Sequence, residues 1–250
     1  MPGNLTKHCA VPLRIAPFSR TSHMVTWLTA ERGIVTTSVK GALRSKSRFV
    51  GQYDLFYTCE IVVYQDRLKE VNPLRECVPI RLREGLRSDW RAVCAASYLC
   101  DLTLTVLQPE QANPTIFALL ESTLDALEST PRRPLSVVLL DYELHLLLDL
   151  GLLPKLDGNG VLQGAAWPNF SYLHGCFLEQ EEPGSVRLPR QVAEDFIRLT
   201  GRLWSGLSSD LPESPSAVQP IVRLVGMILR AQLELPLLSR RICLELIAGH

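Results

Sequence analysis

The sequence predicts an α+β protein, with a five-stranded β-barrel at its N-terminus and an all-helical domain at its C-terminus. Two observations carry this prediction. The first 80 residues hold five short β-branched or alternating segments, separated by turns, which is typical of a small barrel or sandwich. From Arg87 onward the apolar residues recur every three or four positions, which is the period of a helix. We therefore expect one domain at 1–80 and another at 81–250.

The barrel prediction depends on the order and spacing of its strands. A turn at Glu31-Arg32-Gly33 separates two of them, and a basic loop separates the third from the fourth. A five-stranded Greek-key barrel of the oligonucleotide-binding (OB) type fits this count, and an SH3-like barrel fits it nearly as well. The expected strands are Cys9–Pro17, Ser22–Thr29, Gly33–Lys40, Tyr53–Tyr64 and a shorter one around Leu68–Val71.

The helical prediction rests on capping residues as well as on periodicity. Asp89 stands where an N-cap is needed, and Asn113-Pro114 is an N-cap followed by proline at the first helical position. Two stretches interrupt the helical pattern: an irregular insert at about 155–178 and a mobile linker at about 205–216. The expected helices begin near Trp90 and then span Thr115–Glu128, Leu135–Leu150, Gln191–Leu203, Val218–Leu233 and Arg240–Ala248.

Composition and charge limit the classes of function. With 46% hydrophobic and 21% charged residues, the chain is neither disordered nor a membrane protein by composition. It has no signal-peptide pattern, so we expect a cytoplasmic protein. Net charge is zero, yet residues 1–100 hold 15 Lys+Arg against 8 Asp+Glu, and the remainder holds 11 against 18. This asymmetry favours a basic module that meets a polyanion.

The basic loop Val39–Gly51 is the best candidate for that contact. It contains two serines among its cations and no acid. Arg and Lys supply charge, while serine hydroxyls and backbone N–H groups can hydrogen-bond phosphate oxygens. The alternative is that the cations only solvate a loop tip. The four cations are Lys40, Arg44, Lys46 and Arg48.

No catalytic motif is present. The five histidines are dispersed, and we expect His145 to be a helix residue with a satisfied ring nitrogen. The acidic pairs Glu143 with Asp149, and Glu181 with Glu182, are explained by solvated helix or loop faces. The seven cysteines never occur at C-x-x-C spacing, and most have the apolar neighbours of small buried thiols. We therefore expect a non-enzyme.

Five segments, in this order along the chain, resemble the RecO family of bacterial DNA recombination and repair proteins. The most specific is the basic block that ends at Phe49. The segments are T-W-L-T-A-E-R-G-I-V (Thr26–Val35), V-K-G-A-L-R-S-K-S-R-F (Val39–Phe49), A-A-S-Y-L-C-D-L (Ala95–Leu102), N-P-T-I-F-A-L-L (Asn113–Leu120) and Y-E-L-H-L-L-L-D-L-G-L-L-P (Tyr142–Pro154).

The resemblance implies an N-terminal OB barrel, a helical C-terminal domain and a non-catalytic role at the bacterial nucleoid. RecO-like proteins bind single- and double-stranded DNA and anneal complementary strands. They act with RecR, and in one pathway with RecF, to help RecA displace single-strand-binding protein.

One departure from the family concerns zinc. Many members carry four cysteines after the helix that ends in L-G-x-x-P, but here Leu156–Gly160 replaces the first pair and only Cys176 remains near the second. With His174 it supplies two ligands, and a tetrahedral site needs four. We therefore expect no cofactor, and an insert held by the packing of Trp167, Phe170 and Tyr172.

Several further residues are candidates for DNA or protein contacts. Phe49, beside the basic run, is the best candidate for stacking on a base. Arg132-Arg133 and Arg240-Arg241 are candidate pockets for protein partners. Arginines on or between the early strands, or at the domain junction, could extend the DNA-binding face: Arg14, Arg20, Arg32, Arg81, Arg83, Arg87 and Arg91.

Two other functions remain open at this point. The barrel could bind protein rather than DNA and make the chain an adaptor. It could also bind RNA, whose sugars carry a 2′-hydroxyl that the sugars of DNA lack. Salt-dependent binding separates the adaptor from both nucleic-acid functions.

Overall fold

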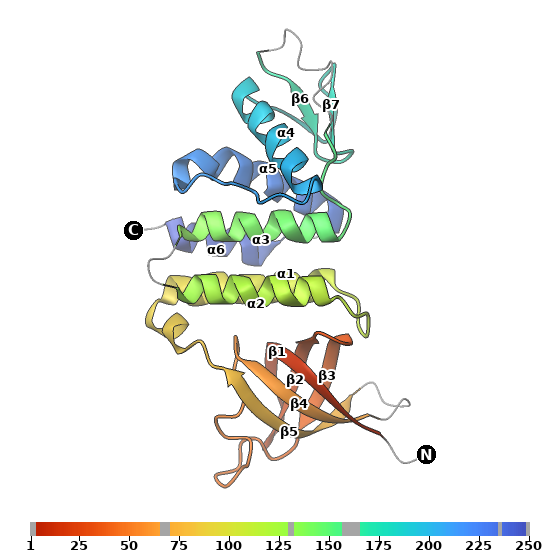
Figure 1. Ribbon diagram of the computed structural model, residues 1–250, viewed down its shortest axis with the longest axis vertical. Coiled ribbons are helices and arrows are strands. Elements are labelled where there is room, and N and C mark those ends of the chain that lie inside the picture. Colours follow the sequence, from red (N-terminus) through yellow and green to blue (C-terminus); the bar gives the residue numbers. More distant parts are fainter. Residues whose placement is uncertain (1–3, 66–70, 130–132, 157–165, 235–236, 249–250) are drawn as a thin grey trace. The chain divides into compact units, whose positions relative to one another are not determined.

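The computed structural model describes residues 4–65, 71–129, 133–156, 166–234 and 237–248. It divides into two compact units, residues 1–131 and 132–250 (Figure 1). The first three predicted strands and the predicted helices are present, whereas the fourth strand begins only at Thr58. The fifth strand starts at Asn72 and is longer than the short one predicted around 68–71, where Val71 is not in a strand and 68–70 lie outside the described residues.

The first unit contains a closed barrel with strand order β1-β2-β3-β5-β4. β1 pairs with both β2 and β4, and β3 runs parallel to β5. This strand order is that of a closed five-stranded barrel, as the sequence predicted, and it is compatible with the Greek-key type. The strands are β1 (Asn4–Ser19), β2 (Ser22–Thr29), β3 (Gly33–Val39), β4 (Thr58–Gln65) and β5 (Asn72–Arg81).

Side chains at alternating positions of the strands point inward and fill the barrel. Trp27 is fully buried at the centre, where its indole N–H donates to the Thr37 hydroxyl at 2.8 Å. Val25, Ile61 and Val63 pack in the same cluster. Because the barrel is closed, β1 has no free edge, and its two register shifts let it bend from one partner strand to the other.

Two helices belong to the same compact unit as the barrel. After a 3₁₀ turn, η1 (Glu84–Ser88), come α1 (Trp90–Val106) and α2 (Pro114–Glu128), which cover one end of the barrel (Figure 1). The predicted caps are confirmed: Asp89 accepts from the Arg91 N–H, and Asn113 from the Ile116 N–H. Sequence reasoning placed a domain boundary at 80/81, whereas the compact units divide at 131/132.

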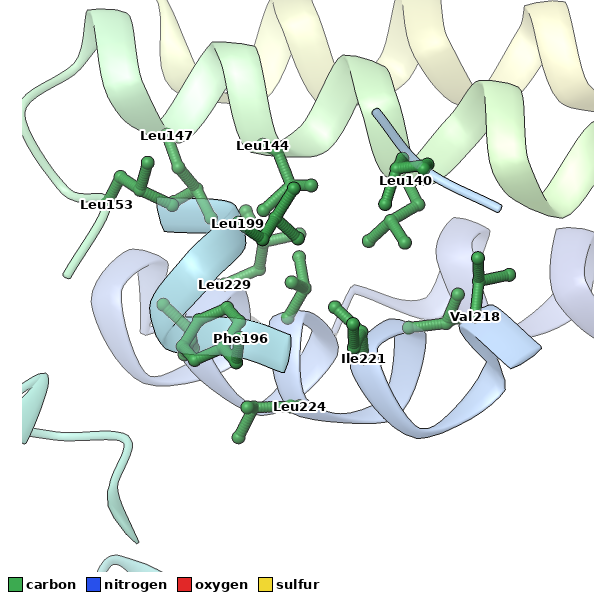
Figure 2. Packing of buried hydrophobic residues seen from close by; sticks show 14 of the residues in the cluster. Leu140, Leu144, Leu147, Leu153, Phe196, Leu199, Val218, Ile221, Leu224 and Leu229 are labelled. Atoms are coloured by element: carbon green, nitrogen blue, oxygen red, sulfur yellow. The ribbon is translucent and has the colours of Figure 1, made fainter. Parts of the chain in front are cut away.

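The second unit packs four helices and a small sheet around one apolar core. Its helices are α3 (Leu135–Asp149), α4 (Arg190–Trp204), α5 (Pro215–Leu233) and α6 (Leu238–Ala248). Leu144 and Leu147 of α3 approach Phe196 and Leu199 of α4, and α5 closes the other side (Figure 2). The sheet has the order β7-β6-β8, formed by β6 (Asn169–Ser171), β7 (Cys176–Leu178) and β8 (Ser185–Arg187).

A buried ion pair joins α3 to α6. Arg240 binds Glu143 through two parallel bonds of 2.8 and 2.9 Å, and donates to the Val222 carbonyl at 2.7 Å. Glu143 is 1% exposed, so the prediction that it lies on a solvated face is wrong. Arg240 is buried too and offers no surface pocket. Gly226 makes room, since a Cβ there would lie 2.3 Å from the arginine Nη1.

The insert and the linker differ from expectation. Phe170 is fully buried and Tyr172 packs against the core, as predicted, but Trp167 is 54% exposed. Positions 157–165 of the insert lie outside the described residues. The segment between α4 and α5 was expected to be a mobile linker, yet Leu211 is buried in the core and the Ser209 hydroxyl donates to Asp141.

Candidate nucleic-acid interface

The basic loop between β3 and β4 is a chain of hydrogen-bonded turns. The Arg44 N–H donates to the Gly41 carbonyl at 3.1 Å, and the Ser47 N–H donates to the Arg44 carbonyl at 2.9 Å. Ala42 and Phe49 project into the barrel core and anchor both sides of the loop. Phe49 is 6% exposed, so this aromatic ring holds the loop and is not available to a base.

The end of the loop is fixed to two strands by thiols. The Gln52 carbonyl accepts from Cys59 of β4 at 3.6 Å and from Cys77 of β5 at 3.3 Å. A hydrogen bond with Cys77, together with burial, raises the pKa of the Cys59 thiol, so it stays protonated and can donate. These contacts, with the core anchors, give the cations of the loop an ordered backbone.

Three loop cations are exposed and available for an anion. They are Lys40, Arg44 and Lys46, and none forms an ion pair within the described part of the chain. Arg48 is also exposed, but its guanidinium lies 4.9 Å from the Phe49 ring centroid and donates to the Arg75 carbonyl at 2.6 Å. The loop thus reaches β5, and Arg75 itself, a further exposed cation, joins its surface.

The turn of the β1–β2 hairpin lies against this loop. The Leu43 N–H donates to the Thr21 carbonyl at 3.1 Å, and the Gly41 N–H donates to the Ser22 hydroxyl at 3.3 Å. Arg20 occupies that turn and is exposed, so the fold brings it beside Lys40 and Arg44. Sequence reasoning could name Arg20 but could not place it.

An open pocket of about 300 Å³ lies beside the loop and is lined in part by Ile15, Val50 and Tyr53. The Tyr53 hydroxyl and the His23 Nδ1 are 2.7 Å apart. Burial, followed by the Cys77 and Asp54 charges, raises the pKa of Tyr53 to about 12. The phenol is therefore protonated at neutral pH, and Tyr53 contributes no charge to the lining of this pocket.

The other predicted arginines divide into exposed and neutralised residues. Arg14 is exposed on β1. Arg32 pairs with Glu110 at 2.9 Å. Arg87 pairs with Asp54 at 2.6 Å, a hydrogen bond that raises its pKa, and stacks on Tyr57. An arginine whose charge is already neutralised by a carboxylate releases fewer counterions when it binds DNA. Arg32 and Arg87 are therefore weaker candidates for DNA contact than the cations of the basic loop.

Arg83 is not a surface residue. Its side chain is fully buried, donates to the Phe56 carbonyl at 2.7 Å, and pairs with Asp125 of α2 at 2.6 Å. Arg81 pairs with the same aspartate. The basic run at the start of the helical region therefore ties α2 to the barrel, and Arg83 cannot reach DNA in this structure.

The cysteine and histidine predictions can be compared with the described residues. Cys176 is exposed, and no group of three or more His, Cys, Asp or Glu side chains in the described ranges could hold a metal. The His145 Nδ1 lies 2.8 Å from the Asp141 carbonyl oxygen, so its predicted role as a satisfied helix residue is confirmed. Within the described residues, no helix is long and apolar enough to span a bilayer.

Two family models match the chain in consecutive ranges. The model described as Recombination protein O N terminal matches residues 4–83, and Recombination protein O C terminal matches residues 87–241. The chain belongs to the RecO family. The two models meet close to the 80/81 boundary expected from sequence, although the helices at 90–128 form one compact unit with the barrel.

Curated relatives carry the same family name. The chain is 30% identical over 207 residues to the DNA repair protein RecO of Myxococcus xanthus, covering 81% of this chain and 83% of the relative. It is 27% identical over 211 residues to that of Anaeromyxobacter sp. (strain Fw109-5), covering 81% and 82%. It is 32% identical over 151 residues to that of Anaeromyxobacter sp. (strain K), covering 60% and 59%. This chain is thus a DNA repair protein of the RecO family.

Two residues near the basic loop were not predicted from the sequence. Arg75 is 27 positions from Arg48, and only the bond from Arg48 to its carbonyl reveals its proximity to the loop. Phe18 is an exposed aromatic in the hairpin that touches the loop. Neither lies in a charged run or motif, so no local signal could have found them.

Proposed function

We propose that this RecO-family protein is a non-catalytic mediator of recombinational repair that binds single- and double-stranded DNA through the basic loop and promotes strand annealing. The observation that supports it is the set of exposed loop cations without acidic partners in the described residues, held on an ordered backbone. Such cations displace counterions from phosphates, so binding is sensitive to salt and largely indifferent to sequence. Two strands held on one protein meet at a raised local concentration, which speeds annealing.

We further propose that RecR, single-strand-binding protein, and in some settings RecF and RecA, are its protein partners. The family membership supports this proposal. The predicted basic pockets give this proposal less support, because Arg240 is buried and Arg133 pairs with Glu213 at 2.8 Å. Arg132 lies outside the described residues. The helical domain would supply protein contacts, while the barrel holds DNA.

The DNA-binding proposal is tested by fluorescence anisotropy with a generic labelled single strand at several salt concentrations. We expect the wild type to give a log–log slope of roughly −2 to −4, from three to five phosphate contacts at about −0.7 each. The variant Lys40/Arg44/Lys46/Arg48→Ala should lose most of the affinity and flatten the slope.

A matched control removes four cations that already have acidic partners: Lys7, Arg190, Arg198 and Arg241, each changed to alanine. The charge removed is the same, so a nonspecific charge effect would weaken both variants equally. Equal binding by the loop variant and the wild type would contradict the proposed site. The absence of any binding would contradict the proposed function.

We propose that the protein folds and acts without zinc or another cofactor. The lone exposed Cys176 and the apolar packing of Phe170 against Phe177 and Phe196 support this. Treatment with a chelator should leave the thermal midpoint unchanged, because folding draws no energy from a metal. Stoichiometric zinc in metal analysis of the purified protein, with a lower midpoint after chelation, would refute it.

The adaptor alternative has one observation in its favour. Val78 and Ile80 are exposed on the outer face of β5, and a contiguous apolar row of this kind can contact protein. Failure of the barrel to bind DNA at low salt would favour this function. Equal affinity for RNA and DNA strands of one sequence would leave the RNA-binding alternative open, whereas preference for RNA would favour it.

A further inference from the structure

We infer that Phe18 is the residue on which a base of single-stranded DNA stacks, an inference that rests on the proposed DNA-binding function. Phe18 is 57% exposed. In the described part of the barrel, Trp27, Phe49 and Phe56 are buried, and Tyr64 is less exposed than Phe18. The exposed ring offers a flat face on which a base can stack.

The strand register turns Phe18 away from the ladder. Pro17 faces His23 and Ser19 faces Ser22, so two consecutive positions of β2 oppose three of β1. Phe18 is the extra residue, a β-bulge two positions before the hairpin turn. Bulges re-aim side chains and are frequent beside functional sites. Here the bulge presents a ring at the hairpin end that contacts the basic loop.

The cations needed to hold the phosphates lie on the same surface. Arg20 follows Phe18 by two residues in the turn, and the Thr21 carbonyl is bonded to the Leu43 N–H of the loop. Leu43 and Val50 of the loop are themselves exposed, and Leu43 is the loop residue whose N–H bonds the hairpin turn. Proteins that bind single strands combine these two elements, a charged track for the backbone and an aromatic face for the bases.

The two elements should act differently on single and double strands. Cations neutralise phosphates of either form, whereas a ring can stack only on a base that is free of its duplex neighbours. Phe18 therefore adds affinity for single strands without adding to the salt slope. It gives the barrel a preference for the unpaired DNA at which repair begins.

The test compares Phe18→Ala, Phe18→Leu and Phe18→Trp in the full chain, using a labelled single strand and a duplex of the same length. We expect Phe18→Ala and Phe18→Leu to lose roughly 5- to 150-fold in single-strand affinity, and Phe18→Trp to retain it. Duplex affinity and both salt slopes should stay unchanged. Trp167→Ala, which removes an equally exposed aromatic from the other unit, should bind as the wild type does.

Abasic oligonucleotides isolate the stacking contribution. If a base stacks on Phe18, the wild type should bind a fully abasic strand about as weakly as Phe18→Ala binds the normal strand. Phe18→Ala should lose much less when the bases are removed. Equal single-strand affinity of Phe18→Ala and the wild type would overturn the inference while leaving the proposed function intact. Retention by Phe18→Leu would show apolar contact instead of stacking and would also overturn it.

Discussion

Replacing Arg240 with alanine is expected to lower the free energy of unfolding of the helical unit by about 3–5 kcal/mol, because it removes the arginine that binds a buried carboxylate through two hydrogen bonds. Glu143 is almost fully enclosed, and Arg240 donates a hydrogen bond to each of its carboxylate oxygens. The Val222 carbonyl loses a donor as well. Urea denaturation followed by circular dichroism measures the change.

Two companion variants separate the ion pair from other causes. Arg241→Ala removes the next residue, whose pairing with Glu245 at 3.9 Å is exposed, and should cost less than about 1 kcal/mol. The double variant Glu143→Leu with Arg240→Met removes both charges, and it should recover much of the loss. Equal stability of Arg240→Ala and Arg241→Ala would show that the buried pair does not hold α6 in place.

Replacing Arg83 with alanine is expected to destabilise the barrel–helix unit by about 2–4 kcal/mol. The substitution removes the donor to the Phe56 carbonyl and leaves Asp125 and Glu121 without their buried partner. The two acids keep part of their hydration, so the cost is smaller than for Arg240. Arg83 also adopts a left-handed backbone with φ of 49°, a conformation that its side-chain contacts help to maintain.

The same variant distinguishes a structural from a DNA-binding role. Below its unfolding temperature, Arg83→Ala should bind single strands with the salt slope of the wild type, because the native side chain does not reach the surface. Arg87→Ala is the control: its pairing with Asp54 is half exposed, so the stability change should stay below about 1 kcal/mol. A flattened slope together with unchanged stability in Arg83→Ala would assign this arginine to DNA.

The distribution of arginine ion pairs explains why one surface of the basic N-terminal part is favoured as the candidate for DNA contact. Arg83 and Arg32 have acidic partners contributed by the helical part of the first unit, at Asp125 and Glu110. At the basic loop, by contrast, Lys40 and Arg44 keep their charge available within the described structure. The excess positive charge that the sequence places in residues 1–100 is thereby concentrated at the hairpin and loop.

Features that depend on neighbours along the chain could be predicted from the sequence alone. Strand and helix types follow from apolar periodicity, and the helix starts at Asp89 and Asn113 follow from side chains that reach the next turn. The basic loop is likewise a local run of cations. The ordered set of motifs was also sufficient to predict the RecO family, which the matching family models confirm.

Which of those residues face solvent depends on how distant segments of the chain pack together. Phe49 lies in a basic run yet fills the barrel, because the loop folds back over the core. Glu143 and Arg240 stand 97 positions apart, and neither has a local signal of burial. The register shift between Pro17 and Ser19 leaves Phe18 as the extra residue of β1, and its ring is exposed. Burial, ion pairing and register depend on elements distant in sequence, and periodicity within one segment carries no information about them.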